Sequence, residues 1–218
     1  MVDDLGLRER KKERTRRALV DAAADLFARK GYDETTIAEI AAAADVSTRT
    51  FFGYFASKEE ILFADTEARI TLALDLIQHR RPADRPADVL LGLVTRFTDP
   101  AAEIAGVMGR MAPVRARLAL THPAVQAHGL RRLFVAQVQI ARALQESYAD
   151  EMDLQTAAAT VGAFVGALVG GMIAVLGDLR DADRPVPERP LDLVAALRPA
   201  ADIAINGIAS VGRGAKRR

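Results

Sequence analysis

The residues best suited to chemistry in this sequence are basic and hydroxylic, and they gather in its first 60 positions. Residues 8–17 contain seven Lys or Arg and two Glu, on a chain whose formal net charge is only +1. Ser47, Thr48, Arg49 and Thr50 then follow one another directly. A local basic cluster suits a polyanion, and adjacent hydroxyl and guanidinium groups suit hydrogen bonding to phosphates and base edges.

Residues for catalysis or metal binding do not assemble in the same way. The 218 residues include no Cys, which excludes disulfides, thiolate metal sites and a Cys nucleophile. His122 and His128 fall on different faces of a helix and make no metal pair, and His79 lies at a basic helix end. Phosphate-binding glycine loops and hydrolase motifs do not occur. We therefore predict no enzyme activity, no cofactor and no metal.

Helices must position the hydroxyl and guanidinium groups. Apolar residues recur at three-to-four spacing over residues 15–30, and Gly31 follows as a helix-ending residue. Thr36 and Glu39 form a capping box that opens a short second helix. The sequence therefore predicts two helices ahead of the polar run.

A tight turn and a third helix complete this unit. Asp45 tolerates the left-handed turn that the break needs, and Ser47 caps a helix predicted to run through residue 55. If Phe51 and Phe55 face inward, Arg49 and Gly53 lie on the opposite side. The predicted core contains Ile37, Ile40, Val46, Phe51 and Phe55, and the flanks carry Thr50, Phe52 and Tyr54.

These residues resemble a known family. The stretch TTIAEIAAAADVSTRTFFGYFASKEEIL, preceded by ALVDAAADLFARKGYDE, is similar to the N-terminal domain of TetR-type transcriptional regulators. The resemblance implies an all-helical homodimer with one helix-turn-helix per subunit. It implies that Thr36 and Lys58 meet phosphates. The implied DNA-binding residues are Thr36, Ser47, Thr48, Arg49, Thr50, Phe52, Gly53, Tyr54 and Lys58. Gly53 and Asp45 depart from the residues that are usual there.

Further helical patterns predict an all-α chain of about nine helices and no strand. Ser57 and Glu60 form a second capping box, which opens a helix predicted to extend to residue 78. Later helices are predicted over 87–98, from 99, over 123–148, 154–176 and 191–210. We place a DNA-binding domain with a basic arm at residues 1–56, and a ligand-binding and dimerisation domain at residues 57–218.

Residues 157–177 carry no charge, so by length alone they could span a membrane. Acidic flanks and the lack of an aromatic belt favour a buried helix over a membrane span, and we predict no membrane partner. Gly162, Gly166 and Gly170 recur every four residues, and we predict that they form a dimer interface. Tight packing within one subunit is the alternative.

Apolar residues of the middle helices are the candidates for a ligand pocket. They are Phe97, Met108, Met111, Leu118, Phe134, Val138, Phe164 and Leu168, and plain core is the alternative for each. Arg110, Arg115 and Arg117 suit either a solvated helix face or an anion-binding rim. A loose similarity to regulators that sense acyl-CoA thioesters implies a hydrophobic or amphiphilic effector, acyl-CoA-like in type.

Together these features predict a cytoplasmic, ligand-responsive repressor that binds a near-palindromic double-stranded DNA operator as a homodimer. The alternative function is a hydrophobic-ligand carrier or interaction module without sequence-specific DNA binding. Gly53 is the only residue that favours this alternative, because the resemblance implies an aromatic or polar residue at this position of the recognition helix, and glycine lacks that contact.

Overall fold

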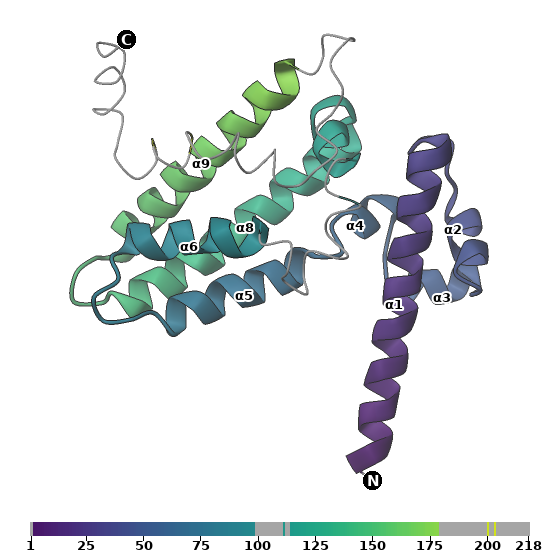
Figure 1. Cartoon of the computed structure of the whole chain (residues 1–218), viewed down its shortest axis with the longest axis horizontal. Coiled ribbons are helices and arrows are strands. Elements are labelled where there is room, and N and C mark those ends of the chain that lie inside the picture. The colour runs from purple at the N-terminus through teal and green to yellow at the C-terminus, as the bar shows by residue number, and fades with distance from the viewer. Residues whose placement is uncertain (1, 99–110, 112–113, 179–199, 201–202, 204–218) are drawn as a thin grey trace. The chain divides into compact units, whose positions relative to one another are not determined.

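The computed structural model describes residues 2–98, 111, 114–178, 200 and 203, and every regular element among them is a helix (Figure 1). This confirms the predicted all-α class. The first four helices are α1 (Val2–Lys30), α2 (Ile37–Ala43), α3 (Thr48–Phe52) and α4 (Lys58–Leu62). They are followed by α5 (Thr66–Gln78), α6 (Pro86–Thr98), α8 (Pro123–Ser147) and α9 (Leu154–Asp178), and residues 114–121 are also helical. The helices predicted from residue 99 and over 191–210 fall outside the described residues, apart from isolated positions.

The chain divides into two compact units. The first combines Met1–Asp65 with Val107–His128, and the second combines Thr66–Gly106 with Gly129–Arg218. Our sequence boundary after residue 56 separates the helix-turn-helix from everything that follows. The first compact unit also includes α4 and the start of α8, and the functional boundary after residue 56 stays a prediction.

The first unit is built around the aromatic residues of α1 and of the α3 region. Phe27, Phe51 and Phe55 are almost completely buried in one apolar cluster. Met111, Leu118 and Val125 are buried in the same cluster, although they come from a distant part of the chain. Burial of each such side chain contributes about 1.5–3 kcal/mol. The later segment is therefore part of this core.

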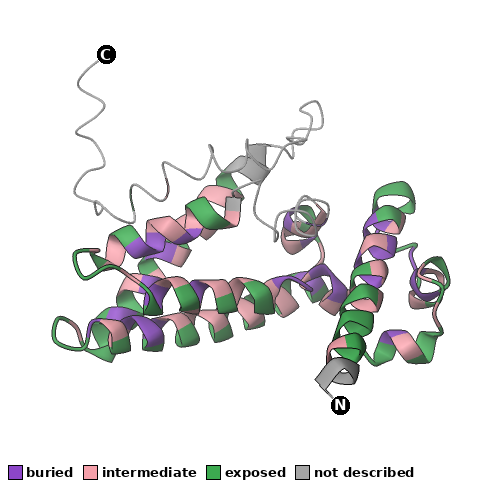
Figure 2. Cartoon of the chain, turned by 60° about the horizontal axis from the view of Figure 1, so that its bottom comes forward, coloured by how far each residue is buried: buried purple, intermediate pink, exposed green. Residues whose placement is uncertain are grey.

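The second unit contains α5, α6, α8 and α9 (Figure 1). One buried cluster joins Ile77 of α5 with Leu144 of α8 and Val161 of α9. Another joins Ala73 of α5 with Leu90 and Leu93 of α6 and Phe164 of α9. In Figure 2 the buried positions lie on the facing sides of these helices, and their outer sides are exposed.

The single helix predicted over residues 57–78 is wrong, because the chain turns between α4 and α5. Phe63 has φ −111° and ψ 23°, and residues 63–65 form a turn. Arg115 donates to the carbonyl of Leu62 at 3.0 Å, and Arg16 donates to the carbonyl of Ala64. These two distant arginines satisfy carbonyl groups that a continuous helix would use internally. The second capping box is also only half formed, since the Glu60 carboxylate accepts from Ala56 N rather than from Ser57 N.

Two other helix limits differ from the prediction. α1 begins at Val2 rather than near residue 15, because residues 7–14 are all helix formers without a Pro or Gly. α3 ends at Phe52 rather than at residue 55. Gly53 is its C-cap, with φ −73°, and so lies at the end of the helix and not within it.

Candidate DNA-binding surface

Side-chain caps hold α2 and α3 in place. Thr36 forms the predicted capping box, with its Oγ1 accepting from Glu39 N at 3.2 Å and its N donating to Glu39 Oε2 at 2.9 Å. Ser47 Oγ accepts from Thr50 N at 3.1 Å at the start of α3. Between these helices Asp45 has φ 56°, the left-handed conformation predicted for it. Contacts between residues close in sequence therefore fix the starts of α2 and α3 and the turn between these helices.

α3 presents a polar and aromatic face to solvent. Phe51 and Phe55 are buried, as predicted, whereas Thr48, Arg49 and Gly53 are exposed. Phe52 is 57% exposed, which is unusual for a large apolar side chain. The remaining predicted residues differ among themselves: Ser47 is exposed, Thr50 and Tyr54 are half-buried, and the hydroxyl groups of Ser47 and Thr50 lie 2.9 Å apart.

Lys58 faces the protein. Its Nζ donates to the carbonyl of Tyr32 at 2.7 Å and to that of Thr35 at 3.0 Å, and it lies 4.2 Å from the centroid of the Tyr32 ring. The Tyr32 hydroxyl donates to Glu59 at 2.7 Å, and burial, followed by this bond, raises the pKa of Tyr32. Lys58 therefore joins α4 to the loop between α1 and α2, an arrangement that its sequence position did not indicate.

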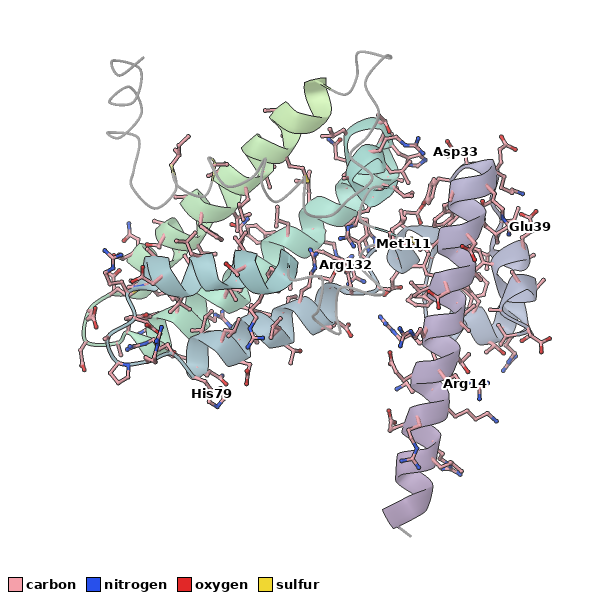
Figure 3. All side chains as sticks on the ribbon, viewed as in Figure 1. Arg14, Asp33, Glu39, His79, Met111 and Arg132 are labelled. Atoms are coloured by element: carbon pink, nitrogen blue, oxygen red, sulfur yellow. The ribbon has the colours of Figure 1, made fainter. Side chains whose placement is uncertain are left out.

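The basic arm, residues 8–17, is the helical N-terminal part of α1. Arg8, Arg10, Lys11, Lys12, Arg14 and Arg17 are exposed. Arg16 differs, because its guanidinium lies 5.3 Å from the centroid of the Phe55 ring and donates to the Ala64 carbonyl. Figure 3 shows Arg14 on the stretch of α1 that extends past α3. The arm thus carries six exposed cations on the unit that contains α3.

A buried ion pair joins the later segment to the α4–α5 turn. The guanidinium of Arg115 lies 2.7 Å from Asp65 Oδ1, and the two side chains are only 13% and 8% exposed. Neither the solvated face nor the anion-binding rim predicted for Arg115 describes this position. Asp65 had no sequence signal of its own, because its partner lies 50 residues away.

The candidate pocket residues are not brought together. Met111 and Leu118 belong to the core of the first unit, whereas Phe97, Phe164 and Leu168 pack in one cluster of the second unit. Phe134 is 70% exposed and Val138 is 39% exposed, so both lie on the surface of α8. Met108 lies outside the described residues. Only the group around Phe164 therefore stays a candidate lining.

The three glycines of α9 lie where the described residues of the chain leave most of the helix surface open. A Cβ added to Gly166 or Gly170 meets no described atom within 4 Å, and one added to Gly162 meets only Gln137 Oε1, at 3.9 Å. Residues Leu154–Ala174 are long and apolar enough to cross a membrane, with a mean hydropathy of 1.9, and only 17% of that window is buried. The described residues of this chain therefore leave most of α9 uncovered.

The three histidines are possible metal ligands, and each of them contacts different partners. His122 contacts Asp33 at 3.2 Å and the edge of the Tyr32 ring, and His128 stacks on Phe63. His79 pairs with Asp75 at the end of α5. In the part of the chain that the structure describes, no group of three or more potential ligands could hold a metal ion.

Comparison with known proteins identifies the family of this chain. The family model for "Bacterial regulatory proteins, tetR family" matches residues 19–64, which contain α2, α3 and α4. The HTH-type transcriptional regulator TcmR of Streptomyces glaucescens is 34% identical over 152 residues, which cover 68% of this chain and 66% of TcmR. This chain belongs to the TetR family. A second relative, the HTH-type transcriptional regulator HbdR of Aromatoleum sp. (strain CIB), is 45% identical over 51 residues, which cover 23% of this chain and 22% of HbdR.

Solved structures of two transcriptional regulators share the fold. A transcriptional regulator from Syntrophomonas wolfei has a TM-score of 0.60 at 17% identity, over 92% of this chain and 99% of its own. FadR from Bacillus subtilis, solved in complex with stearoyl-CoA, has a TM-score of 0.55 at 18% identity, over 88% of this chain and 98% of its own. These similarities show the fold of the chain.

Proposed function

We propose that this TetR-family chain is a cytoplasmic, ligand-responsive repressor that binds a near-palindromic DNA operator as a homodimer. The observation that carries the proposal is the face of α3. Its buried Phe51 and the following Phe55 fix the helix in the core, while Thr48, Arg49 and Phe52 are exposed together. A short capped helix with such a face suits the major groove.

Each exposed residue of α3 has a chemical match on base edges. The guanidinium of Arg49 can donate two parallel hydrogen bonds to guanine, which discriminates between bases by about 1–3 kcal/mol. The exposed ring of Phe52 suits the methyl group of thymine. Thr36, Thr48, Thr50 and Tyr54 then suit phosphates and nearby edges, and Ser47 serves mainly as the cap of α3.

The experiment is a binding measurement with Arg49→Ala on a selected operator and on random duplexes of equal length. Selection of genomic fragments by the purified wild-type dimer supplies the operator. We expect Arg49→Ala to lose about 5- to 150-fold in operator affinity per half-site, which corresponds to about 1–3 kcal/mol for each subunit, with a much smaller loss on random DNA. Equal losses on both duplexes would contradict base reading by Arg49.

The alternative function is a carrier that does not bind DNA, and Gly53 is its sequence support. Gly53 forms the C-cap of α3 and so does not interrupt the helix. A glycine offers no side chain to DNA, but Arg49 and Phe52 are exposed on α3 and can supply contacts. Failure of the wild-type protein to enrich any genomic fragment would restore this alternative.

For the effector we propose a small hydrophobic or amphiphilic molecule that binds beside Phe97, Phe164 and Leu168. These side chains share one apolar cluster of α5, α6 and α9, and the guanidinium of Arg69 lies 5.3 Å from the Phe97 ring centroid. An apolar site edged by a cation suits an acyl chain with an anionic head group. Free CoA, palmitate and stearoyl-CoA are the probes, and release of operator DNA by stearoyl-CoA alone is the result expected for an acyl-CoA effector.

For the homodimer we propose that α8 and α9 form the interface. Leu130, Phe134 and Val138 of α8 are exposed at i, i+4 and i+8, and Gly162, Gly166 and Gly170 of α9 leave a flat strip. Gln137 lies against Gly162, so these two faces adjoin. Projecting apolar side chains on one helix and a glycine strip on the other are suited to a two-fold, self-complementary contact.

Gly166→Leu tests this interface by sedimentation. Within one chain the new side chain has room, because a Cβ there meets no described atom within 4 Å. We therefore expect a folded monomer with an unchanged helical circular-dichroism spectrum. Gly92→Leu on α6 is the matched control, because that Cβ also meets no described atom within 4 Å, and it should stay dimeric. A Gly166→Leu protein that remains a dimer would refute the glycine contact.

A further inference from the structure

The N-terminal part of α1 is longer than its own unit requires. α1 has 29 residues, but Leu19 is the first of them in the buried cluster. Residues 7–14 are all exposed, and Figure 1 shows the N-terminal end of α1 extending past α3. At 1.5 Å per residue, the arm of residues 8–17 is about 14 Å long. Packing within the unit does not explain this length.

Charge is unevenly distributed around the arm. At 100° per residue, Glu9 and Glu13 share one stripe, and Lys11 points to the opposite side. Arg8 and Lys12 lie on one flank of Lys11. The other flank carries Arg10, Arg14 and Arg17, again at helical spacing. The arm is therefore a helix with one acidic stripe and a basic arc around the rest of its circumference.

Duplex DNA is the polyanion that this arc fits, because the same unit presents α3. DNA carries about one negative charge per 1.7 Å of its axis, so roughly eight phosphate charges lie along 14 Å. An α-helix is about 10–12 Å wide with its side chains, whereas the minor groove is only about 6 Å wide. A continuous helix therefore meets the sugar–phosphate backbone and does not enter the minor groove.

We infer that the arm binds, as an intact helix, the phosphates that flank the groove occupied by α3. The Lys11 side faces the DNA, and the stripe of Glu9 and Glu13 faces away from it. Such contacts carry no sequence information, but they add affinity and fix the register of the bound protein. This inference rests on the proposed function as a DNA-binding regulator.

The salt dependence of binding tests the charge part of the inference. In the full-length dimer, Arg8→Gln, Lys11→Gln and Lys12→Gln are combined. Each phosphate contact contributes about 0.9 to the slope of log affinity against log salt concentration. We expect a slope shallower by about 5 for a dimer with both arms bound. Operator and random duplexes should lose affinity by the same factor.

The matched control combines Arg29→Gln, Arg96→Gln and Arg117→Gln, which are exposed positions outside the arm. It changes the net charge by the same amount, so its slope should stay within about 1 of wild type. If the two triple variants have equal slopes, the Lys11 side of the arm makes no phosphate contacts and the inference is wrong. A wild-type protein that binds all duplexes alike, with the arm variant still shallower, would contradict the proposed function and leave the arm contacts standing.

Thr15→Pro tests whether the arm binds as a helix. It retains every charge, removes the backbone donor that reaches Lys11, and falls where proline is tolerated in the first turn of the remaining helix. For an intact helical arm we expect a shallower salt slope and a shorter hydroxyl-radical footprint. An unchanged slope and footprint would show that the arm binds as a flexible chain, which would overturn the helical part of the inference.

Discussion

The buried pair between Arg115 and Asp65 gives a stability prediction that can be worked from the structure. Asp65→Asn keeps the shape of the side chain but removes its charge, and the Arg115 side chain is only 13% exposed. Removing one partner of a buried pair costs about 3–5 kcal/mol. We expect about 3 kcal/mol here, because Arg115 keeps the Leu62 carbonyl as an acceptor.

Thermal unfolding, followed by circular dichroism at constant protein concentration, is the assay. For a chain of 150–250 residues, 1 kcal/mol shifts Tm by about 2–4 °C, so Asp65→Asn should lower Tm by roughly 6–12 °C. Asp88→Asn is the control, because it breaks an exposed pair with Arg85 and should leave Tm nearly unchanged.

A double-mutant cycle decides whether the pair itself is responsible. Arg115→Met keeps apolar contact beside Phe63, whose ring centroid lies 5.8 Å from the guanidinium. If Arg115 and Asp65 act together, the double variant should be more stable than the sum of the single losses predicts, by at least 1 kcal/mol. Losses that add to within about 0.5 kcal/mol would refute a coupled pair.

Three further predictions follow from single contacts. Lys58→Ala should lower Tm and leave the salt slope of DNA binding unchanged, because its ammonium holds carbonyls of the α1–α2 loop; a slope reduced by about 1 per subunit would show a phosphate contact instead. The hydrogen bond from Lys30, followed by those within the capping box, lowers the pKa of Glu39 from 4.5 to about 2. The stabilisation by its charge is therefore present above about pH 4.5 and lost as pH falls toward 2. Glu39→Gln should differ from wild type in Tm at pH 7 and converge with it at pH 2. A Tm difference that stays constant with pH would show that the Glu39 charge does not contribute to stability. Asp45→Val should cost about 1–2 kcal/mol in urea unfolding because φ is 56° there, whereas Asp45→Gly should be tolerated; equal stabilities for the Val and Gly variants would contradict backbone strain.

Short-range patterns made the helix-turn-helix predictable. Thr36 with Glu39, the Ser47 cap and the left-handed Asp45 each depend on residues within four positions, and each appears in the structure. The spacing of Phe51 and Phe55 was enough to tell the inner face of α3 from its outer face. Such features are encoded locally, so one sequence suffices to read them.

Long-range contacts could not be read in the same way. The turn that separates α4 from α5 is held by Arg16 and Arg115, which lie 48 and 53 residues from the carbonyl groups that they satisfy. Phe134 has the spacing of a core residue but faces solvent in the single chain. An apolar stripe shows that a surface is buried against something, but not which element or which molecule covers it.

The discontinuous first unit also limits how this regulator can be recombined. Met111, Leu118 and Val125 complete the core of the first unit, so a fragment cut at residue 65 would lose three buried side chains and the partner of Asp65. If the C-terminal part of another regulator were joined at a single junction, residues of that regulator would replace Met111, Leu118 and Val125 in the core under α1–α4. A working chimaera needs two grafted segments, and natural variation in effector preference is restricted to changes that leave residues 111–128 compatible with the N-terminal helices.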